Sequence, residues 1–361
     1  MNKLLSIVVP VYKVEQYIRK CLDSLIVADE LMDQLEVIVV NDGTPDRSAI
    51  IAKEYEKKYP QTFRVIDKDN GGHGSAWNRG LAEAQGKYVA FLDSDDWYST
   101  ESLASLLAYL ETTNVDGVMT KMMTHIFEKD KEIRTNIQCN KEFSSLKSNE
   151  VYDTCHFDFN QCGMPMYNFQ HLCYKTDKLR NTGVRFMENT SYDDDLVGLA
   201  GLLMMDRFVY LDMILYNYRF GREGQSVGGS YSLKRVNQYY LTAKLLYEFY
   251  QSYVVNHQVC ENQLRIARKF VAHTTFCLFP HFAMLPKDKA LEMFDQMKKE
   301  FGCYSLYRQI MSNADPFFLQ SPEKIYDYYY KKRKKGEMID LFALSPIGKL
   351  LRKIKHLFSQ A

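Results

Sequence analysis

The chain has 361 residues, of which 46% are hydrophobic and 25% are charged, and its formal net charge is +1. This composition is typical of a globular protein long enough for one large domain or two of ordinary size. No apolar run reaches the roughly 20 residues that span a bilayer, and the N-terminus has too short an apolar stretch for a signal peptide. We therefore expect a cytoplasmic protein whose eight cysteines are reduced thiols.

The first hundred residues alternate between short apolar, β-branched runs and helical patterns. The strand candidates are LSIVVP at 5–10, LEVIVV at 35–40, FRVI at 63–66 and YVAFL at 88–92. Between them, helical spacing is found at 18–25, 49–59 and 75–84. The alternation predicts a parallel sheet with crossover helices, and the nearly continuous apolar strands predict that both faces of the sheet are covered.

Polar residues follow each of the four predicted strands. The strands run into Pro10-Val11-Tyr12, Asn41-Asp42-Gly43, Asp67-Lys68-Asp69-Asn70-Gly71-Gly72 and Asp93-Ser94-Asp95-Asp96. Ligands of open α/β sheets bind outside the carboxyl ends of the strands. These four strand ends therefore predict one binding cleft.

Beyond residue 99 the pattern changes. STESLASLLAYLETT predicts a helix, residues 117–123 a strand, and the charged, irregular stretch 128–150 a surface excursion. From about 231 to 330 the sequence is helical and rich in aromatic residues, which predicts a mostly helical module. The predicted domains are 1–226, 227–330 and a tail at 331–361.

The carboxylates after the fourth strand have the spacing of metal ligands. Asp93 and Asp95 are two residues apart, so an extended segment places both side chains on the same side. Carboxylate oxygens suit Mg²⁺ or Mn²⁺, whose remaining positions substrate phosphates can fill. The alternative is an acidic helix start, which the helix dipole favours. Asp42 is either an acceptor for the edge of a nucleotide or a solvated loop residue.

Taken together, these motifs resemble the family 2 inverting glycosyltransferases, which have the GT-A fold. The matching segments are SIVVPVYKVEQYIRKCLDSL, EVIVVNDGTPDRS, NGGHGSAWNRG and YVAFLDSDDW, the last of which carries the DxD motif. The resemblance continues through YDDDL at 192–196 and LYNYRFGREGQS, to about residue 225. It implies a Rossmann-like GT-A domain, with a mostly parallel sheet and flanking helices, before the helical module.

The resemblance implies a donor site for a nucleotide sugar. Asp42 would contact the nucleobase, and Pro10, Tyr12 and Glu15 would shape the same pocket. Asp93 would face the ribose and the metal, and Asp95 would ligate the Mn²⁺ or Mg²⁺ that bridges the diphosphate. The other donor-binding positions would be Asn70, Gly71, Asn78, Ser94, Arg219, Arg222 and Ser226, of which the last three would reach the diphosphate or the acceptor, or else lie on a surface loop.

The resemblance also implies a catalytic base in YDDDL. Asp194 is the preferred residue, but Asp193 stands where the family usually has Glu, so the choice between the two stays open. One carboxylate suffices to take the proton of an acceptor hydroxyl that attacks C1 from the face opposite the nucleotide, and this displacement inverts the anomeric centre. The Q-x-x-R-W motif of processive members is absent, which predicts transfer of one sugar per encounter.

The near-zero net charge conceals a basic tail. Residues 331–361 hold nine Lys and Arg against two acidic residues. The segment LSPIGKLLRKIKHLF places its apolar residues on one helical face. A basic amphipathic helix favours an anionic membrane surface; the alternative is a final helix packed on the protein. Nucleic acid is disfavoured as a partner because the rest of the chain is acidic.

The sequence thus predicts a metal-dependent inverting glycosyltransferase, peripheral to the inner face of the cell membrane. It would move a hexosyl or N-acetylhexosaminyl group from a UDP-sugar to a hydroxyl of a lipid-linked glycan acceptor in capsule or exopolysaccharide synthesis. A protein glycan or a teichoic-type polymer is the alternative acceptor. A non-catalytic, membrane-associated scaffold is the alternative from another class.

Overall fold

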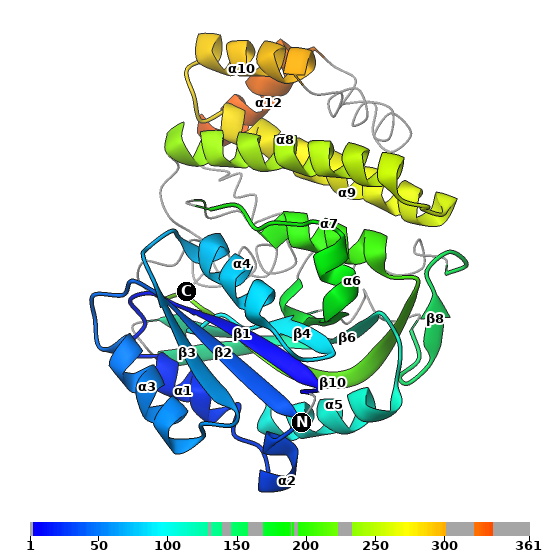
Figure 1. Cartoon of the computed structure of the whole chain (residues 1–361). Helices are drawn as coiled ribbons and strands as arrows, with labels where there is room; N and C mark the ends of the chain where they lie inside the picture. The colour runs from blue at the N-terminus through cyan, green and yellow to red at the C-terminus, as the bar shows by residue number, and fades with distance from the viewer. Residues whose placement is uncertain are drawn as a thin grey trace. The chain divides into compact units, whose positions relative to one another are not determined.

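The computed structural model describes residues 3–128, 131–138, 146–157, 169–188, 190, 194–222, 233–300 and 321–334. The chain divides into two compact units, Met1–Arg222 and Glu223–Ala361 (Figure 1). The first unit carries the sheet, and the second is helical wherever it forms regular structure among the described residues.

The first unit is built on a ten-stranded mixed sheet. The strand order is β3-β2-β1-β4-β9-β6-β10-β5, with β7 paired to β6 and β8 to β10. The strands are β1 (Leu5–Val11), β2 (Leu35–Asp42), β3 (Phe63–Lys68), β4 (Tyr88–Phe91), β5 (Trp97–Tyr98), β6 (Gly117–Glu128), β7 (Lys131–Gln138), β8 (Val151–Asp153), β9 (Leu172–Lys175) and β10 (Arg207–Phe220). The first four are parallel to one another, which confirms the predicted strands and the predicted sheet.

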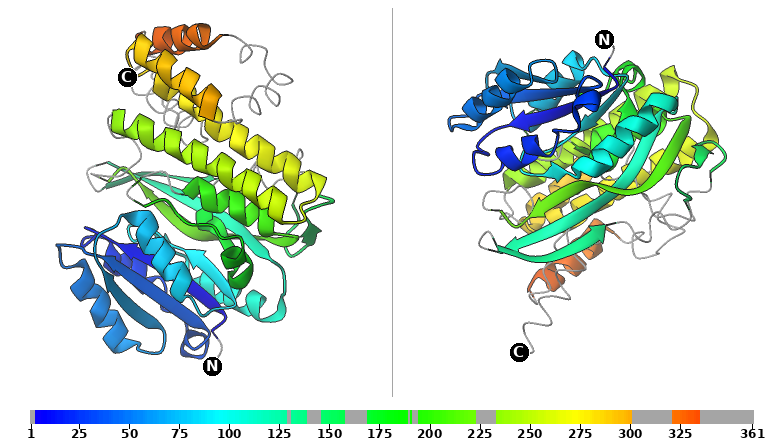
Figure 2. Two further views of the ribbon diagram at one scale, coloured as in Figure 1. Left: turned by 45° about the horizontal axis from the view of Figure 1, so that its top comes forward. Right: turned by 90° about the horizontal axis from the view of Figure 1, so that it is seen from below.

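Helices cover both faces of this sheet (Figure 1 and Figure 2). One face carries α1, α3 and α5, and the other carries α4, α6 and α7. The bounds are α1 (Ile18–Asp23), α2 (Asp29–Met32), α3 (Ser48–Lys58), α4 (His73–Glu83), α5 (Thr100–Thr112), η2 (Phe169–His171), α6 (Thr176–Asn181) and α7 (Asp194–Met204). Every residue of β1 is buried, as the continuous apolar run predicts.

The stretch 128–150 differs from the expectation of an irregular excursion. Residues 131–138 form β7, which pairs antiparallel with β6. The charged composition hid this strand because its described side chains, at 131–135, are exposed, so it has no apolar face to reveal it. A second strand that was not predicted from the sequence is β10 at 207–220, which runs parallel to β6.

The second unit consists of helices in its described part. They are α8 (Leu233–Asn256), α9 (Glu261–Phe282), α10 (Lys287–Glu300) and α12 (Pro322–Lys334). Phe279, Phe282, Phe294 and Ile325 are fully buried, which confirms a helical region with its own apolar core. No described helix is long and apolar enough to cross a membrane. The predicted tail helix lies outside the described residues.

The cysteines only partly match the expectation of reduced thiols. Cys21 and Cys173 are free and buried, whereas Cys155 and Cys260 are disulfide-bonded. The prediction was therefore wrong for the latter two, because it rested on the lack of a close Cys pair and of a signal peptide, and neither feature reports which cysteines approach each other in the fold.

Candidate functional site

The predicted cleft edge exists because four strands end side by side. In the parallel register, Val11 of β1 stands beside Asn41 of β2, and Asp42 stands beside Lys68 of β3. On its other side β1 pairs with β4, which ends at Phe91. The polar segments that follow these strands therefore lie along one edge of the sheet, as the sequence predicts.

Asp42 organises the loop after β3. Its side chain is only 3% exposed. One carboxylate oxygen accepts hydrogen bonds from Lys68 Nζ (2.6 Å) and from the Gly71 amide (2.9 Å), and the other accepts from the Gly72 amide (2.8 Å). The Asn70 side chain donates to the Asp42 carbonyl (2.8 Å). Asp42, Asn70 and Gly71 are thus brought together, with Lys68 as a partner that the sequence analysis missed.

The loops after β1 and β2 are joined by reciprocal hydrogen bonds. The Glu15 carboxylate accepts from the Arg47 amide (3.1 Å), and the Glu15 amide donates to the Asp46 carboxylate (3.1 Å). Pro10 is buried in β1, while the Tyr12 side chain is 43% exposed. Of the three predicted residues Pro10, Tyr12 and Glu15, Tyr12 therefore offers an accessible aromatic ring. The Glu15 carboxylate already accepts one hydrogen bond from the neighbouring loop.

The acidic turn, residues 93–96, follows β4. Asp93 Oδ1 lies 2.8 Å from His73 Nε2, at the first residue of α4. Ser94 is buried. Asp95 forms an ion pair with the Arg222 Nε, and its side chain is 12% exposed. Burial raises the pKa of Asp95 above its ordinary value; Arg222 opposes this shift and Asp93 adds to it.

Asp96 fastens this turn to β10. It is 1% exposed, and it accepts hydrogen bonds from the Tyr216 hydroxyl and from the Arg219 amide, both at 2.6 Å. The Tyr216 hydroxyl also lies 3.3 Å from Asp93 Oδ2 and accepts the Asp93 amide hydrogen bond at 3.2 Å. Burial raises the pKa of Asp96 well above its ordinary value, and the charges of Asp95 and Asp93 add to the shift.

The end of β10 therefore brings two arginines to the acidic turn. The Arg219 guanidinium lies over the ring of Phe127, 3.9 Å from its centroid, and 4.9 Å from the centroid of Tyr17. Arg222 lies beyond the strand and pairs with Asp95. The structure places both predicted residues at the cleft edge, and it adds Tyr216, which no local motif marks.

The acidic turn offers oxygen ligands to a divalent cation of a type that the protein coordinates only in part, with other ligands completing its coordination. Among the described residues, no three His, Cys, Asp or Glu side chains gather into a metal-binding cluster. Two carboxylates, Asp93 and Asp95, are present; burial raises the pKa of Asp95 and the charge of Asp93 adds to this shift, so a cation here would stabilise the ionised form. Magnesium-like ions are commonly held by one or two carboxylates plus substrate phosphates, so this donor set suits such an ion only together with a phosphate ligand.

Asn78 has a structural partner. Its side-chain amide donates to the Phe186 carbonyl (2.9 Å), and its amide oxygen accepts the Phe186 N–H (2.8 Å). This pair ties α4 to the segment that precedes α7. Both polar ends of Asn78 thus serve the protein backbone, and its predicted contact with a donor stays a prediction.

The predicted catalytic base is described only in its backbone. Asp194 is the first residue of α7, but the placement of its side chain is not described, and Asp193 and Ser226 lie outside the described residues. Asp195 follows at an intermediate burial, and α7 is apolar and buried from Leu196 onward. A buried helix therefore begins at the position where the sequence predicts the base.

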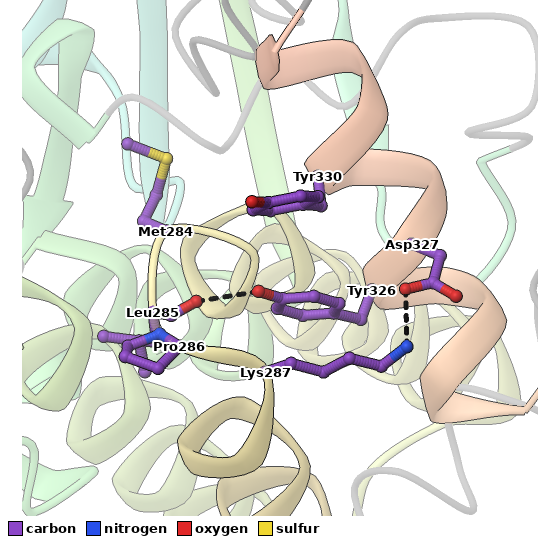
Figure 3. Close-up of a pocket in the computed structure, with 7 residues that line it drawn as sticks. All are labelled: Met284, Leu285, Pro286, Lys287, Tyr326, Asp327 and Tyr330. Atoms are coloured by element: carbon purple, nitrogen blue, oxygen red, sulfur yellow. Dashed lines mark hydrogen bonds and ion pairs between the residues drawn. The ribbon is translucent and has the colours of Figure 1, made fainter.

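The second unit has a surface hollow of about 470 Å³ between α12 and residues 284–287, which lead from α9 into the start of α10 (Figure 3). Inside it, the Tyr326 hydroxyl donates to the Leu285 carbonyl (2.9 Å), and Lys287 pairs with Asp327 (2.7 Å). Tyr326 stacks against Tyr330 with ring centroids 5.6 Å apart. Because Tyr326 is only 3% exposed, these contacts join two helices and offer little aromatic surface to a ligand.

A known protein family matches most of the first unit. Residues 6–172 match the family model "Glycosyl transferase family 2". The chain is similar to the uncharacterized glycosyltransferase EpsJ of Bacillus subtilis, at 31% identity over 61% of this chain and 62% of that protein. It is also similar to the minor teichoic acid biosynthesis protein GgaB of B. subtilis, at 31% identity over 61% of this chain and 23% of that protein. The chain thus spans less than two thirds of the length of these relatives.

Among solved structures, the fold is similar to that of Staphylococcus aureus TarS 1–349 in complex with UDP-GlcNAc. The TM-score is 0.68 at 21% sequence identity, and the match covers 92% of both chains. This likeness confirms the predicted GT-A fold, including a helical region after the sheet-containing unit.

Proposed function

We propose that the protein is a metal-dependent inverting glycosyltransferase, and the match of residues 6–172 to the family model "Glycosyl transferase family 2" supports this proposal. It moves one sugar from a nucleotide-sugar donor to a hydroxyl of a glycan acceptor. The observation that carries this proposal is the acidic turn, whose Asp93 and Asp95 follow β4 beside the polar end of β1. A UDP-sugar is the proposed donor, in line with the ligand of the TarS structure.

The nucleoside part of the donor is proposed to bind at the ends of β1 and β2. Tyr12 offers an exposed aromatic face to a base. The Asp42 carboxylate accepts three hydrogen bonds within the protein, and a carboxylate has about four acceptor positions, so one remains for a base N–H. Pro10 and Glu15 flank this pocket. Lys68, Gly71 and Gly72 would then hold Asp42 in the orientation that the base requires.

The diphosphate is proposed to bind at the acidic turn. Asp95 and Asp93 would hold Mn²⁺ or Mg²⁺, and the bound ion supplies positive charge that stabilises the leaving diphosphate. Arg219 and Arg222 add two further positive charges at the same edge, and Ser226 is proposed to act with them. Fixed charges of this kind need no reorganisation when negative charge develops on the leaving group.

The acceptor hydroxyl is proposed to lose its proton to Asp194, with Asp193 as the alternative. A single carboxylate within hydrogen-bond reach is sufficient for this step. The new bond forms at C1 on the face opposite the diphosphate, the bond from C1 to the phosphate oxygen breaks, and the proton passes to the carboxylate. The Asn78–Phe186 hydrogen bonds support this role indirectly, because they fix the chain eight residues before Asp194.

A lipid-linked glycan is the proposed acceptor, and a teichoic-type polymer is the second candidate. The similarity to GgaB, a minor teichoic acid biosynthesis protein, favours the second candidate. The basic tail at 331–361 supports the first, because it would hold the enzyme at the inner face of an anionic membrane where such acceptors are assembled.

Release of nucleoside diphosphate tests the proposed function without knowledge of the acceptor. The protein is incubated with a panel of nucleotide sugars and Mn²⁺, and release is compared before and after a chelator is added. We expect one donor to be hydrolysed, release to stop with the chelator, and Asp95→Asn to lose it. Asp69→Asn is the matched control, because Asp69 is an exposed acid in the neighbouring loop. No release from any donor would favour the non-catalytic scaffold.

A further inference from the structure

The ion pair between Arg222 and Asp95 occupies the carboxylate that the metal requires. Arg222 Nε contacts Asp95 Oδ2, and the two side chains are only 22% and 12% exposed. A guanidinium bonded to a carboxylate in such a partly buried site forms a charge-assisted hydrogen bond, which is stronger than a neutral one. A cation that takes up this oxygen must therefore compete with Arg222.

The position of Arg222 is built into the end of β10. Asp96 holds the Arg219 amide and the Tyr216 hydroxyl, so the strand is fixed three residues before Arg222. Gly221 then has a φ of +103°, and a Cβ at this residue would lie 2.2 Å from the Phe127 carbonyl oxygen. Only glycine fits this conformation and this approach to β6. The backbone is thus specified in the residues that lead up to Arg222.

When no other cation is present, the neighbouring carboxylates stabilise the ion pair between Arg222 and Asp95. Asp93, Asp95 and Asp96 lie within four positions of one turn, the Asp95 side chain is 12% exposed, and Arg222 is paired with it. If Arg222 left without a replacement, three carboxylates would remain together in a poorly hydrated turn, which is electrostatically costly. If it left while a divalent cation entered and a diphosphate arrived, both the carboxylates and the guanidinium would have new partners.

We propose that Arg222 is an exchangeable counter-ion of Asp95 that couples metal binding to nucleotide binding. Metal alone binds weakly because it must displace Arg222 into solvent. Metal together with a nucleoside diphosphate binds tightly because the phosphates accept the displaced guanidinium. Coupling between two ligands is reciprocal, so the metal strengthens nucleotide binding by the same factor. This inference rests on the proposed donor and adds a reason for the two ligands to bind together.

The test is the affinity for Mn²⁺, measured by the electron paramagnetic resonance of free Mn²⁺, with and without UDP. Arg222→Gln removes the charge at similar size. We expect this variant to bind Mn²⁺ alone about tenfold more tightly than the unsubstituted protein, because one charge-assisted hydrogen bond no longer competes. We also expect the factor by which UDP raises the affinity for Mn²⁺ to be about tenfold smaller in the variant. Arg222→Lys, which keeps the charge but loses the planar fork, should fall between the two.

Lys20→Gln is the matched control for the loss of one positive charge at this edge. Lys20 lies over the ring of Trp97, next to the acidic turn, 3.1 Å from the ring centroid. We expect it to change Mn²⁺ affinity less than about twofold in either condition, as for a partly exposed charge. Equal tightening in Lys20→Gln and Arg222→Gln, or unchanged coupling in Arg222→Gln, would overturn the inference while leaving the proposed function intact. Failure of the unsubstituted protein to bind Mn²⁺ and UDP would contradict both.

Discussion

Replacing Tyr216 by Phe would remove the hydroxyl that fastens the acidic turn to β10 and leave the ring in place. Tyr216 is fully buried. Its hydroxyl donates to Asp96 at 2.6 Å and accepts the Asp93 amide at 3.2 Å. The substitution therefore leaves a buried carboxylate oxygen and a backbone N–H without these partners, with no change of apolar volume large enough to matter.

The expected cost follows from these two bonds. A buried polar group that loses its hydrogen-bond partner lowers the free energy of unfolding by about 1 to 3 kcal/mol. For the charged Asp96 carboxylate we expect a value near the upper end of this range. The pKa of Asp96 is already raised well above its ordinary value by burial and by Asp95 and Asp93, so Asp96 can take up a proton in the variant, which limits the penalty. We expect Tyr216→Phe to lower the free energy of unfolding of the first unit by about 2 kcal/mol.

Tyr98→Phe is the matched control. Tyr98 pairs with Tyr216 across β5 and β10, and their rings lie 5.7 Å apart. It is also buried, but its hydroxyl has no hydrogen-bond partner in the described part of the chain. Removal of this hydroxyl should change the free energy of unfolding by less than about 0.5 kcal/mol, or stabilise the protein, because an unsatisfied polar group is lost.

Urea denaturation followed by tryptophan fluorescence measures both variants. The two tryptophans of the chain, Trp77 and Trp97, lie in the first unit, so their emission reports its unfolding. We expect a lower midpoint for Tyr216→Phe at an unchanged dependence on urea. Equal costs for the two variants, or a cost below about 0.5 kcal/mol for Tyr216→Phe, would refute the account of Asp96 as the residue that fixes β10 to the acidic turn.

Three further predictions concern the base, acid stability and the tail. Asp194→Asn should reduce transfer by orders of magnitude with donor binding retained; normal turnover would move the base elsewhere. Burial would raise the pKa of Asp46, but hydrogen bonds from Ser48 and Thr44 outweigh it and hold this pKa below its ordinary value. The contribution of ionised Asp46 to the free energy of unfolding is therefore present above the unfolded-state pKa and lost as pH falls through the folded-state pKa. The loss of stability caused by Asp46→Asn, measured in urea, should be largest near neutral pH and should vanish in acid. A loss of stability that does not depend on pH would contradict this prediction. Removal of 331–361 should shift the protein from the membrane to the soluble fraction, and unchanged fractionation would exclude the tail as the anchor.

The parallel half of the sheet was predictable because each of its strands carries its own signal. β1, β2 and β4 are buried along nearly their whole length. Their sequences are continuous apolar runs, and this pattern predicts the burial. The polar strand ends followed from the same reasoning, since parallel strands bring their carboxyl ends to one edge. Asp42, Asp93 and Asp95 were therefore found from the sequence, together with the edge on which they lie.

The partners of these residues were not predictable in the same way. Lys68 was read as part of a loop, and its bond to Asp42 depends on the register between β2 and β3. Tyr216 meets Asp96 across 120 positions of sequence, and its strand was not recognised. Interactions of this kind depend on which strands become neighbours, and the spacing of residues within a motif does not encode that choice. The Asp95–Arg222 ion pair is the example with the largest consequence, because Asp95 was expected to ligate the metal and Arg222 to bind the donor.

The anomeric configuration of the released sugar distinguishes an inverting from a retaining reaction. The enzyme, Mn²⁺ and the donor identified by the release assay are followed by time-resolved proton NMR, with water as the acceptor, before the sugar anomers equilibrate. We expect the first sugar to appear to have the configuration opposite to that in the donor, and we expect a chelator to prevent its appearance. A first-formed sugar with retained configuration would contradict a single displacement assisted by one base.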